Sequence, residues 1–376
     1  MRTDANLRIR CLCLLPVLIG LLSLHPVGGS LASIPAPGGD IHPPDIAPAP
    51  DGGSTVRPAV SFAAATASDG RWSSMAPGLP DDVLAVAAAG VDIYVGGDFL
   101  NAGGDPAADY VAHWDGADWE ALGTGLNGTV HAIEVVGSDI YVGGEFTDAG
   151  GKAHADRIAR WDGAEWHVLG SGLNGKVEAI AAAGPDVYVG GSFTETGSGG
   201  TLTRIARWDG AAWHPIGSGV NGTVFAIAVE GPDLYLGGFF SDAGGLNVDR
   251  IVRWDGSAWH SLGSGVNGGV NAIAVEGADV YVGGYFTATG SGSPLNHIAR
   301  WDGTTWHAVG SGVDGWVFAV AVEGANVYIG GAFEDASGLD EADHIVRWDG
   351  TQWHALGSGL NADVTAVTIT GPDVYV

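Results

Sequence analysis

The chain has 376 residues, 64 of them glycine, with a hydrophobic fraction of 46% and a charged fraction of only 15%. This composition indicates a turn-rich globular protein and excludes disorder for most of the chain. Acidic residues number 43 against 15 basic ones, giving a net charge of −28. A chain so acidic repels phosphate backbones, so nucleic acid is excluded as an expected partner.

Residues 1–32 have the layout of a secretory signal peptide. Arginines precede the apolar run CLCLLPVLIGLLSL, and small residues follow it, which is the order of regions in such a peptide. The run is too short for a membrane span. It contains the chain's two cysteines, Cys11 and Cys13, so we expect the mature protein to have no disulfide and no cysteine metal ligand.

Residues 33–67 are rich in Pro, Ala and Gly, a composition that favours extended conformations and predicts a linker. No further hydrophobic stretch of membrane-spanning length follows in the sequence. We therefore expect a secreted, extracellular, periplasmic or cell-surface protein with no membrane span once the signal peptide is removed.

Residues 68–376 are built from a repeat that contains the motif WDGxxW. Its second tryptophan recurs every 46 or 47 residues, at Trp72, Trp119, Trp166, Trp213, Trp259, Trp306 and Trp353. The tyrosine of D-[VIL]-Y-[VIL]-G-G recurs with the same step. A period of this length built from short strands is typical of a β-propeller blade.

One period shows the expected strands. Apolar residues alternate in VHAIEVVG (130–137), and a tight turn precedes IYVGGEF (140–146). A variable loop leads to RIARW (157–161), and an Asp-Gly turn precedes WHVLG (166–170). Four such strands predict a twisted antiparallel sheet. Its apolar faces require stacking against other blades, and a closed ring removes most exposed edges.

The two tryptophans of each motif stand on the third and fourth strands across one hairpin. Cross-strand pairing and packing against the neighbouring blade make them structural core residues, in preference to a ligand-stacking role. The residues concerned are Trp114, Trp119, Trp161, Trp166, Trp208, Trp213, Trp254, Trp259, Trp301, Trp306, Trp348 and Trp353.

The repeat resembles the kelch repeat of kelch and galactose-oxidase-type propellers, because a hairpin ending in Gly-Gly is followed by an aromatic-Asp turn and W-x-x-[LIV]. The sequence of the repeat is more similar still to uncharacterised bacterial exported repeat proteins and to the repeat region of a fungal cortical polarity landmark protein. One apolar residue fewer precedes Gly-Gly than in ordinary kelch repeats, which places the resemblance at superfamily level. It implies a propeller that acts as a binding or display platform.

The ends of the repeat region predict the blade count. Residues 68–79 have the pattern of a fourth strand without the other three, and residues 363–376 have the pattern of the first and second strands of a blade. Together they predict a seventh blade that is closed by the N-terminal strand and lacks its third strand. The expected fold class is thus an all-β propeller of about seven four-stranded antiparallel blades, six of them complete in sequence.

No catalytic residue follows from the sequence. Copper chemistry of the galactose oxidase type requires a cysteine, which the mature chain lacks, and no nucleophile elbow, phosphate loop or HExxH motif occurs. A histidine follows the fourth-strand tryptophan in five repeats, but blade symmetry places these histidines too far apart to share a metal ion. They are His167, His214, His260, His307 and His354.

The loop between the second and third strands offers a calcium hypothesis, because acidic groups recur in it at two fixed distances from the Phe after Gly-Gly. Carboxylate oxygens brought together by a loop suit Ca²⁺. The alternative is that the first Asp caps a turn while the second pairs with an adjacent Arg or with solvent. The candidate ligands are Asp148 with Asp156, Asp242 with Asp249, and Asp335 with Asp343.

A ligand site in a ring of repeats is expected where the repeats differ. Two positions at the start of the first strand differ most, and propeller geometry places them at one mouth of the central channel. Their mixture of aromatic and polar groups suits sugars or peptides, with local core packing as the alternative. The candidates are Trp316, Lys176, His131, Glu178, Phe225, Phe318 and Asn271.

The first functional hypothesis is a non-enzymatic propeller, expected to be monomeric, that binds a protein or a glycan through one face. A second is an enzyme acting on carbohydrate with its site scattered over loops, since propellers host both classes. A third is a purely structural surface protein.

Overall fold

The computed structural model describes residues 8–11, 71–75, 77–339, 341–371 and 373–376. The predicted linker and all of the predicted signal peptide except Arg8–Cys11 lie outside these residues. The described part is all-β: it holds no α-helix, only the short 3-10 turn η1 (Ala102–Gly104). None of its helical segments is long and apolar enough to cross a membrane.

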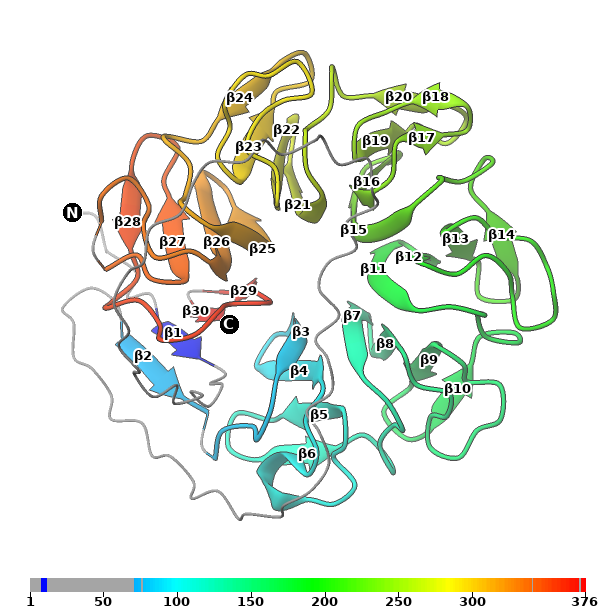
Figure 1. Cartoon of the computed structure of the whole chain (residues 1–376). Helices are drawn as coiled ribbons and strands as arrows, with labels where there is room; N and C mark the ends of the chain where they lie inside the picture. Colours follow the sequence, from blue (N-terminus) through cyan, green and yellow to red (C-terminus); the bar gives the residue numbers. More distant parts are fainter. Residues whose placement is uncertain (1–7, 12–70, 76, 340, 372) are drawn as a thin grey trace, which may run out of the picture. The chain divides into compact units, whose positions relative to one another are not determined.

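Six four-stranded antiparallel blades make up the propeller (Figure 1). Blade 1 consists of β3 (Val83–Ala89), β4 (Asp92–Gly97), β5 (Val111–Trp114) and β6 (Trp119–Ala121). Blade 2 consists of β7 (Val130–Val136), β8 (Asp139–Gly144), β9 (Ile158–Trp161) and β10 (Trp166–Val168). Blade 3 consists of β11 (Val177–Ala183), β12 (Asp186–Gly191), β13 (Ile205–Trp208) and β14 (Trp213–Pro215).

The remaining blades repeat this order of strands. Blade 4 consists of β15 (Thr223–Glu230), β16 (Asp233–Phe239), β19 (Ile251–Trp254) and β20 (Trp259–Ser261), with the small hairpin of β17 (Asp242–Ala243) and β18 (Leu246–Asn247) in its loop. Blade 5 consists of β21 (Val270–Glu276), β22 (Asp279–Gly284), β23 (Ile298–Trp301) and β24 (Trp306–Ala308). Blade 6 consists of β25 (Trp316–Glu323), β26 (Asn326–Ala332), β27 (Ile345–Trp348) and β28 (Trp353–Ala355).

Tight turns join the strands of each blade, as blade 2 shows. Val136 pairs with Asp139 across a two-residue turn, and Gly137 in that turn has a φ of 65°, a left-handed conformation that glycine adopts without steric cost. In the second turn Asp162 Oδ1 accepts hydrogen bonds from the backbone N–H groups of Ala164 and Glu165. The Asp of WDGxxW therefore acts as a turn-forming residue.

The Gly-Gly pair of the second strand allows two close approaches. A Cβ on Gly143 would lie 2.3 Å from Val177 Cγ1 of the next blade, and a Cβ on Gly144 would lie 2.0 Å from the carbonyl oxygen of Thr129, which directly precedes the paired strand. The first glycine thus lets neighbouring blades pack together, and the second lets the first hairpin close.

The tryptophans pair across the third and fourth strands and join the core between blades. Trp161 stands opposite Trp166, with ring centroids 5.4 Å apart, and Trp166 is 2% exposed. The indole N–H of Trp166 donates to the carbonyl of Leu122 in the preceding blade at 2.9 Å. Trp119, Trp213 and Trp306 donate to preceding carbonyls in the same way.

The sheet between blades 6 and 1 is built differently, and we call it the closing sheet. It consists of β1 (Arg8–Cys11), β2 (Arg71–Ser74), β29 (Thr368–Thr370) and β30 (Asp373–Tyr375) in the order β2-β1-β30-β29. Here β1 runs parallel to both of its neighbours, unlike any strand of the six blades. The described residues thus show six antiparallel blades and not the expected seventh. The third position of the closing sheet is taken by residues of the predicted signal peptide.

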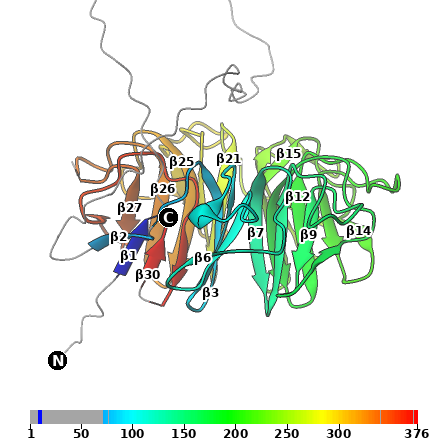
Figure 2. The same ribbon diagram turned by 90° about the horizontal axis from the view of Figure 1, so that it is seen from below.

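The first strands of successive sheets lie side by side around the ring centre, and β29 lies next to both β25 and β3. Trp72 donates to the carbonyl of Leu356 at 2.8 Å, which repeats the contact between blades across most of the sequence. Tyr375, which is 2% exposed, packs in the core cluster of blade 1. Seen from the side, the strands run between two faces that carry the loops (Figure 2).

Candidate functional site at the channel mouth

The variable positions of the first strand coincide with a β-bulge in every blade. In blade 2, Val130 pairs with Gly144 while Ala132 pairs with Gly143, so His131 is the extra residue. The same register shift recurs in all six blades. A bulge re-aims its side chain and often lies next to functional sites. The bulged residues are Leu84, His131, Glu178, Phe225, Asn271 and Phe318.

A second unusual backbone position stands directly before the third strand of each blade. Six residues other than glycine have a φ between 62° and 70° there: Tyr110, Arg157, Arg204, Arg250, His297 and His344. In blade 2 the carbonyl of Arg157 accepts the N–H of Gly144 at 3.0 Å, and its N–H donates to the carbonyl of Phe146 at 2.8 Å. Left-handed backbone in residues with side chains costs free energy, and the same two bonds hold this position in all six blades, so it serves the blade.

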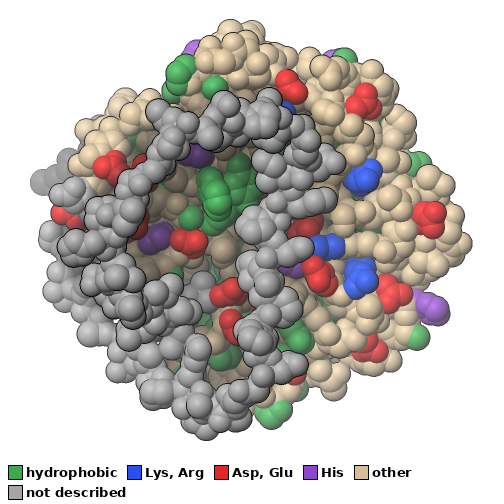
Figure 3. Space-filling view, in the orientation of Figure 1, with side chains coloured by type: hydrophobic (Ala, Val, Ile, Leu, Met, Phe, Trp, Pro, Cys, Tyr) green, Lys and Arg blue, Asp and Glu red, His purple; other side chains and the backbone are tan. Residues whose placement is uncertain are grey.

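Aromatic side chains of blades 4, 5 and 6 form a continuous row, which we call the aromatic arc: Phe225, Phe239, Tyr285, Trp316 and Phe318. The ring centroids of Phe225 and Phe239 are 5.7 Å apart, and those of Phe239 and Tyr285 are 5.9 Å apart. Tyr285 meets Trp316 at 5.1 Å and Phe318 at 6.3 Å, edge to face in both cases. A hydrophobic patch near the middle of the face in Figure 3 lies beside acidic side chains.

Trp316 is the exposed member of the aromatic arc, with 48% of its surface open to solvent. Its neighbour Tyr285 lies beside Asn271, whose amide donates to the carbonyl of Val317 at 3.1 Å. Room for the Phe239 ring comes from Gly269, because a Cβ there would lie 2.6 Å from that ring. The arc is therefore a supported surface with one indole ring open to solvent.

Four ionisable side chains of blades 2 and 3 form a second group, which we call the charged cluster: His131, Glu145, Lys176 and Glu178. Lys176 Nζ lies 3.0 Å from Glu145 Oε1 and 3.3 Å from Glu178 Oε1. Each His131 ring nitrogen is 3.8 Å from one of these carboxylates. The strands that carry Glu178 and Phe225, β11 and β15, are neighbours, so the charged cluster precedes the aromatic arc in the order of the blades.

Burial and neighbouring charges shift the pKa values of the cluster members in different directions. Burial lowers the pKa of His131 to about 4, and the charge of Lys176 acts in the same direction. Burial raises the pKa of Glu178 above its usual range in spite of Lys176. Burial also acts to raise the pKa of Glu145, but Lys176, His131 and Arg157 outweigh it and hold that pKa below its usual range.

All seven residues that the sequence singled out for the channel mouth belong to these two groups or contact them. The sequence reasoning missed Glu145, Phe239 and Tyr285. All three occupy the position between Gly-Gly and Phe, which also differs from blade to blade. From blade 1 to blade 6 the residues there are Asp98, Glu145, Ser192, Phe239, Tyr285 and Ala332. The variation among the repeats at this third position could therefore have identified these residues from the sequence.

The loops proposed for calcium contain turn-capping aspartates. Asp148 Oδ1 accepts the N–H of Gly151 at 2.6 Å, and Asp242 and Asp335 accept the N–H three residues later in the same way. Asp249 lies 3.5 Å from Arg250. No three His, Cys, Asp or Glu side chains converge to hold a metal ion within the described ranges.

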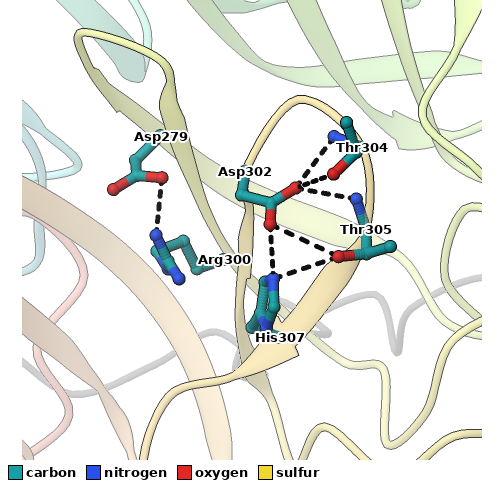
Figure 4. Close-up of polar contacts among 6 residues, drawn as sticks. All are labelled: Asp279, Arg300, Asp302, Thr304, Thr305 and His307. Atoms are coloured by element: carbon teal, nitrogen blue, oxygen red, sulfur yellow. Dashed lines mark hydrogen bonds and ion pairs between the residues drawn. The ribbon is translucent and has the colours of Figure 1, made fainter.

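The five repeated histidines each contact the aspartate of their own turn. In blade 5, His307 Nε2 lies 2.6 Å from Asp302 Oδ2, while Thr304 and Thr305 donate to the same carboxylate (Figure 4). The Thr304 hydroxyl, the backbone N–H groups and His307 hold the pKa of Asp302 well below its usual range. The arrangement strengthens a turn and assembles no shared site.

Comparisons with known proteins show the fold of the chain alone. No protein-family model and no curated protein matches the sequence. The computationally designed Ika8 protein has a similar fold, with 17% identity and a TM-score of 0.50 over 78% of this chain and 80% of the designed one.

Two crystal structures of the extracellular domain of BT4673 from B. thetaiotaomicron are also similar, each with 11% identity and a TM-score of 0.50. They match 77% and 76% of this chain, which spans only about a third of their length, 36% and 35%. At such identities the likeness shows the fold alone. The chain is an all-β propeller of six four-stranded antiparallel blades, and its structural neighbours include extracellular domains.

Proposed function

We propose that this protein is a secreted or cell-surface propeller that binds a protein or glycan ligand at the channel mouth without catalysing a reaction. One observation carries the proposal: in six blades of one design, the bulged position at the mouth holds five different kinds of side chain. The positions that build a blade are nearly the same in every repeat. The mouth positions differ although the bulge is shared, as expected if they serve a ligand and not the blade.

The proposal places the chain among kelch-like propellers with seven positions in the ring. Val364, which precedes β29, packs against Gly330 of blade 6 as Val177 of blade 3 packs against Gly143 of blade 2, which supports a seventh position in the ring at the closing sheet. Removal of a signal peptide ending near residue 32 would remove β1, and the contacts of Trp72 with Leu356 and of β29 with β3 would still join the ends of the ring.

A test compares binding by Trp316→Ala and Lys176→Ala with binding by Val91→Ala. Val91 is 72% exposed in the turn at the opposite end of the first hairpin, so it serves as the matched control. Arrays of immobilised glycans and peptides are the probes. We expect the wild type and Val91→Ala to bind the same ligand, and the two mouth variants to lose most of that binding. Equal binding by all four proteins would remove the mouth from consideration.

An enzyme acting on carbohydrate is the second candidate, and the charged cluster favours it. Glu145 and Glu178 share Lys176, and their pKa values move in opposite directions, which is typical of an acid and base pair. Assay of the bound glycan for new reducing ends separates the candidates. Turnover that Glu178→Gln abolishes would replace the binding function with an enzymatic one.

Calcium binding by the loops of Asp148, Asp242 and Asp335 is a further proposal. Ca²⁺ takes six to eight oxygen ligands, so each loop would have to add backbone carbonyls and water to its carboxylates. Calorimetric titration with Ca²⁺ tests it, and absence of heat at millimolar calcium would end it.

A further inference from the structure

We infer that the ligand of the channel mouth is a neutral oligosaccharide whose sugar rings lie along the aromatic arc while their hydroxyl groups bond to the charged cluster. This inference rests on the proposed function and adds the chemical class of the ligand.

The length of the aromatic arc is the first argument. It runs through three successive blades by contacts of 5.7, 5.9 and 5.1 Å between ring centroids, from Phe225 to Trp316. An aromatic face packs well against the C–H face of a sugar ring, because its quadrupole is negative at the face and C–H groups are weakly positive. Trp316 is the exposed ring of the row and the other four are partly buried, so one sugar stacks on the indole while its neighbours in the chain extend along the row.

The orientation of the rings is the second argument. Tyr285 meets Trp316 edge to face, at an interplanar angle of 81°, so it supports the indole ring without stacking on it. Trp316 is nevertheless 48% exposed, whereas the tryptophans of WDGxxW are largely buried in the core clusters. A large exposed aromatic residue beside polar groups is characteristic of a binding surface.

The balance of charge in the cluster is the third argument, and it favours a sugar over a peptide. Lys176 stands between two carboxylates within 3.3 Å of its Nζ, so its charge is already compensated. The cluster can accept hydrogen bonds through Glu145 and donate them through Lys176. Neutral hydroxyl groups, which both donate and accept, match this set, whereas a charged peptide side chain or terminus would have to displace an existing pair.

The experiment uses neutral oligosaccharides of one to six units and short peptides on the same array, followed by calorimetry with the best glycan. We expect affinity to rise from one unit to at least two and then level off. Trp316→Ala should weaken binding about 30-fold, the size of an aromatic hot spot. Glu145→Gln should weaken it about tenfold through loss of a charged acceptor, and Val91→Ala should leave it unchanged.

The other possible results refute either the sugar inference alone or the proposed function with it. Binding of peptides alone, lost in Trp316→Ala, would refute the sugar inference and leave the proposed function in place. Binding of no glycan on the array would also refute the inference. Glycan binding that is equal in Trp316→Ala and wild type would refute both. Near-ultraviolet circular dichroism shows whether each variant is folded, and Trp316→Phe, which keeps a ring, is the fallback should Trp316→Ala unfold.

Discussion

At the scale of single residues, the repeats act as controls for one another. Gly269 stands where other blades have Asp, Thr, Lys or Trp, because the Phe239 ring occupies the space of its side chain. Glu134 is a second departure. Its position in β7 is occupied by a small side chain in the other blades, namely Ala87, Ala181, Ala228, Ala274 and Ala321.

Glu134 predicts a dependence of stability on pH. Burial raises its pKa from 4.5 to about 7, although the backbone of Ala182 acts against the shift. Between these values the folded protein holds more protons than the unfolded chain, so the free energy of unfolding decreases as the pH rises. Glu134→Ala should remove this dependence and stabilise the protein on the order of 3 kcal/mol at pH 8.

Urea unfolding of wild type and Glu134→Ala at pH 5 and pH 8 measures the effect. The difference between the two proteins should be larger at pH 8. A difference that is equal at both values, or larger at pH 5, would contradict the assignment. Glu134→Gln, which keeps the shape without the charge, separates the electrostatic effect from a packing effect.

At the scale of the elements, the first hairpin of a blade depends on the second glycine of Gly-Gly. The bulge brings the backbone of the first strand against this glycine, and the close approach recurs at Gly97, Gly144, Gly191, Gly238, Gly284 and Gly331. The bulge and the glycine that tolerates it therefore form one structural unit.

Gly144→Ala tests this unit. Its Cβ would lie 2.0 Å from the carbonyl oxygen of Thr129, and a paired strand cannot move away without breaking its hydrogen bonds. We expect a loss of at least about 3 kcal/mol in the free energy of unfolding. Gly137→Asn is the matched control, because its surroundings are open and Asn tolerates a positive φ. Similar stabilities for the two variants, measured by urea unfolding, would contradict the close approach.

At the scale of the whole molecule, closure of the ring depends on contacts between its two sequence ends. Trp72 and Leu356 are joined by the same hydrogen bond that joins adjacent blades elsewhere. Tyr375 and Val374 reach opposite sides, the first into the core of blade 1 and the second into that of blade 6. The closing sheet is thus held by its neighbours on both sides.

Trp72→Phe should weaken this closure, because the ring stays but the donor to Leu356 is lost. We expect the free energy of unfolding to fall by about 1 to 2 kcal/mol. Amide exchange should become faster in β29 and β30. The matched control is Trp306→Phe, which removes the equivalent bond to Leu262 inside the ring. If both variants accelerate exchange in β29 and β30 equally, Trp72 has no special role in closure.

The sequence alone determined the blades, because their strands rest on local patterns. Alternating apolar residues, Asp-Gly turns and a step of 46 or 47 residues specify a four-stranded sheet and require its stacking. The two variable positions at the start of the first strand, which include Trp316 and Lys176, were also visible when the repeats of this one chain were compared.

Only the tertiary structure decided how those positions are used and how the ring ends meet. The bulge at His131 depends on pairing with a strand that begins several residues later, and the contacts of Tyr285 with Trp316 join two blades. The mixed closing sheet brings together residues from both ends of the chain. Such contacts depend on the path of the backbone through space, and a local sequence pattern does not record which distant residues that path brings together.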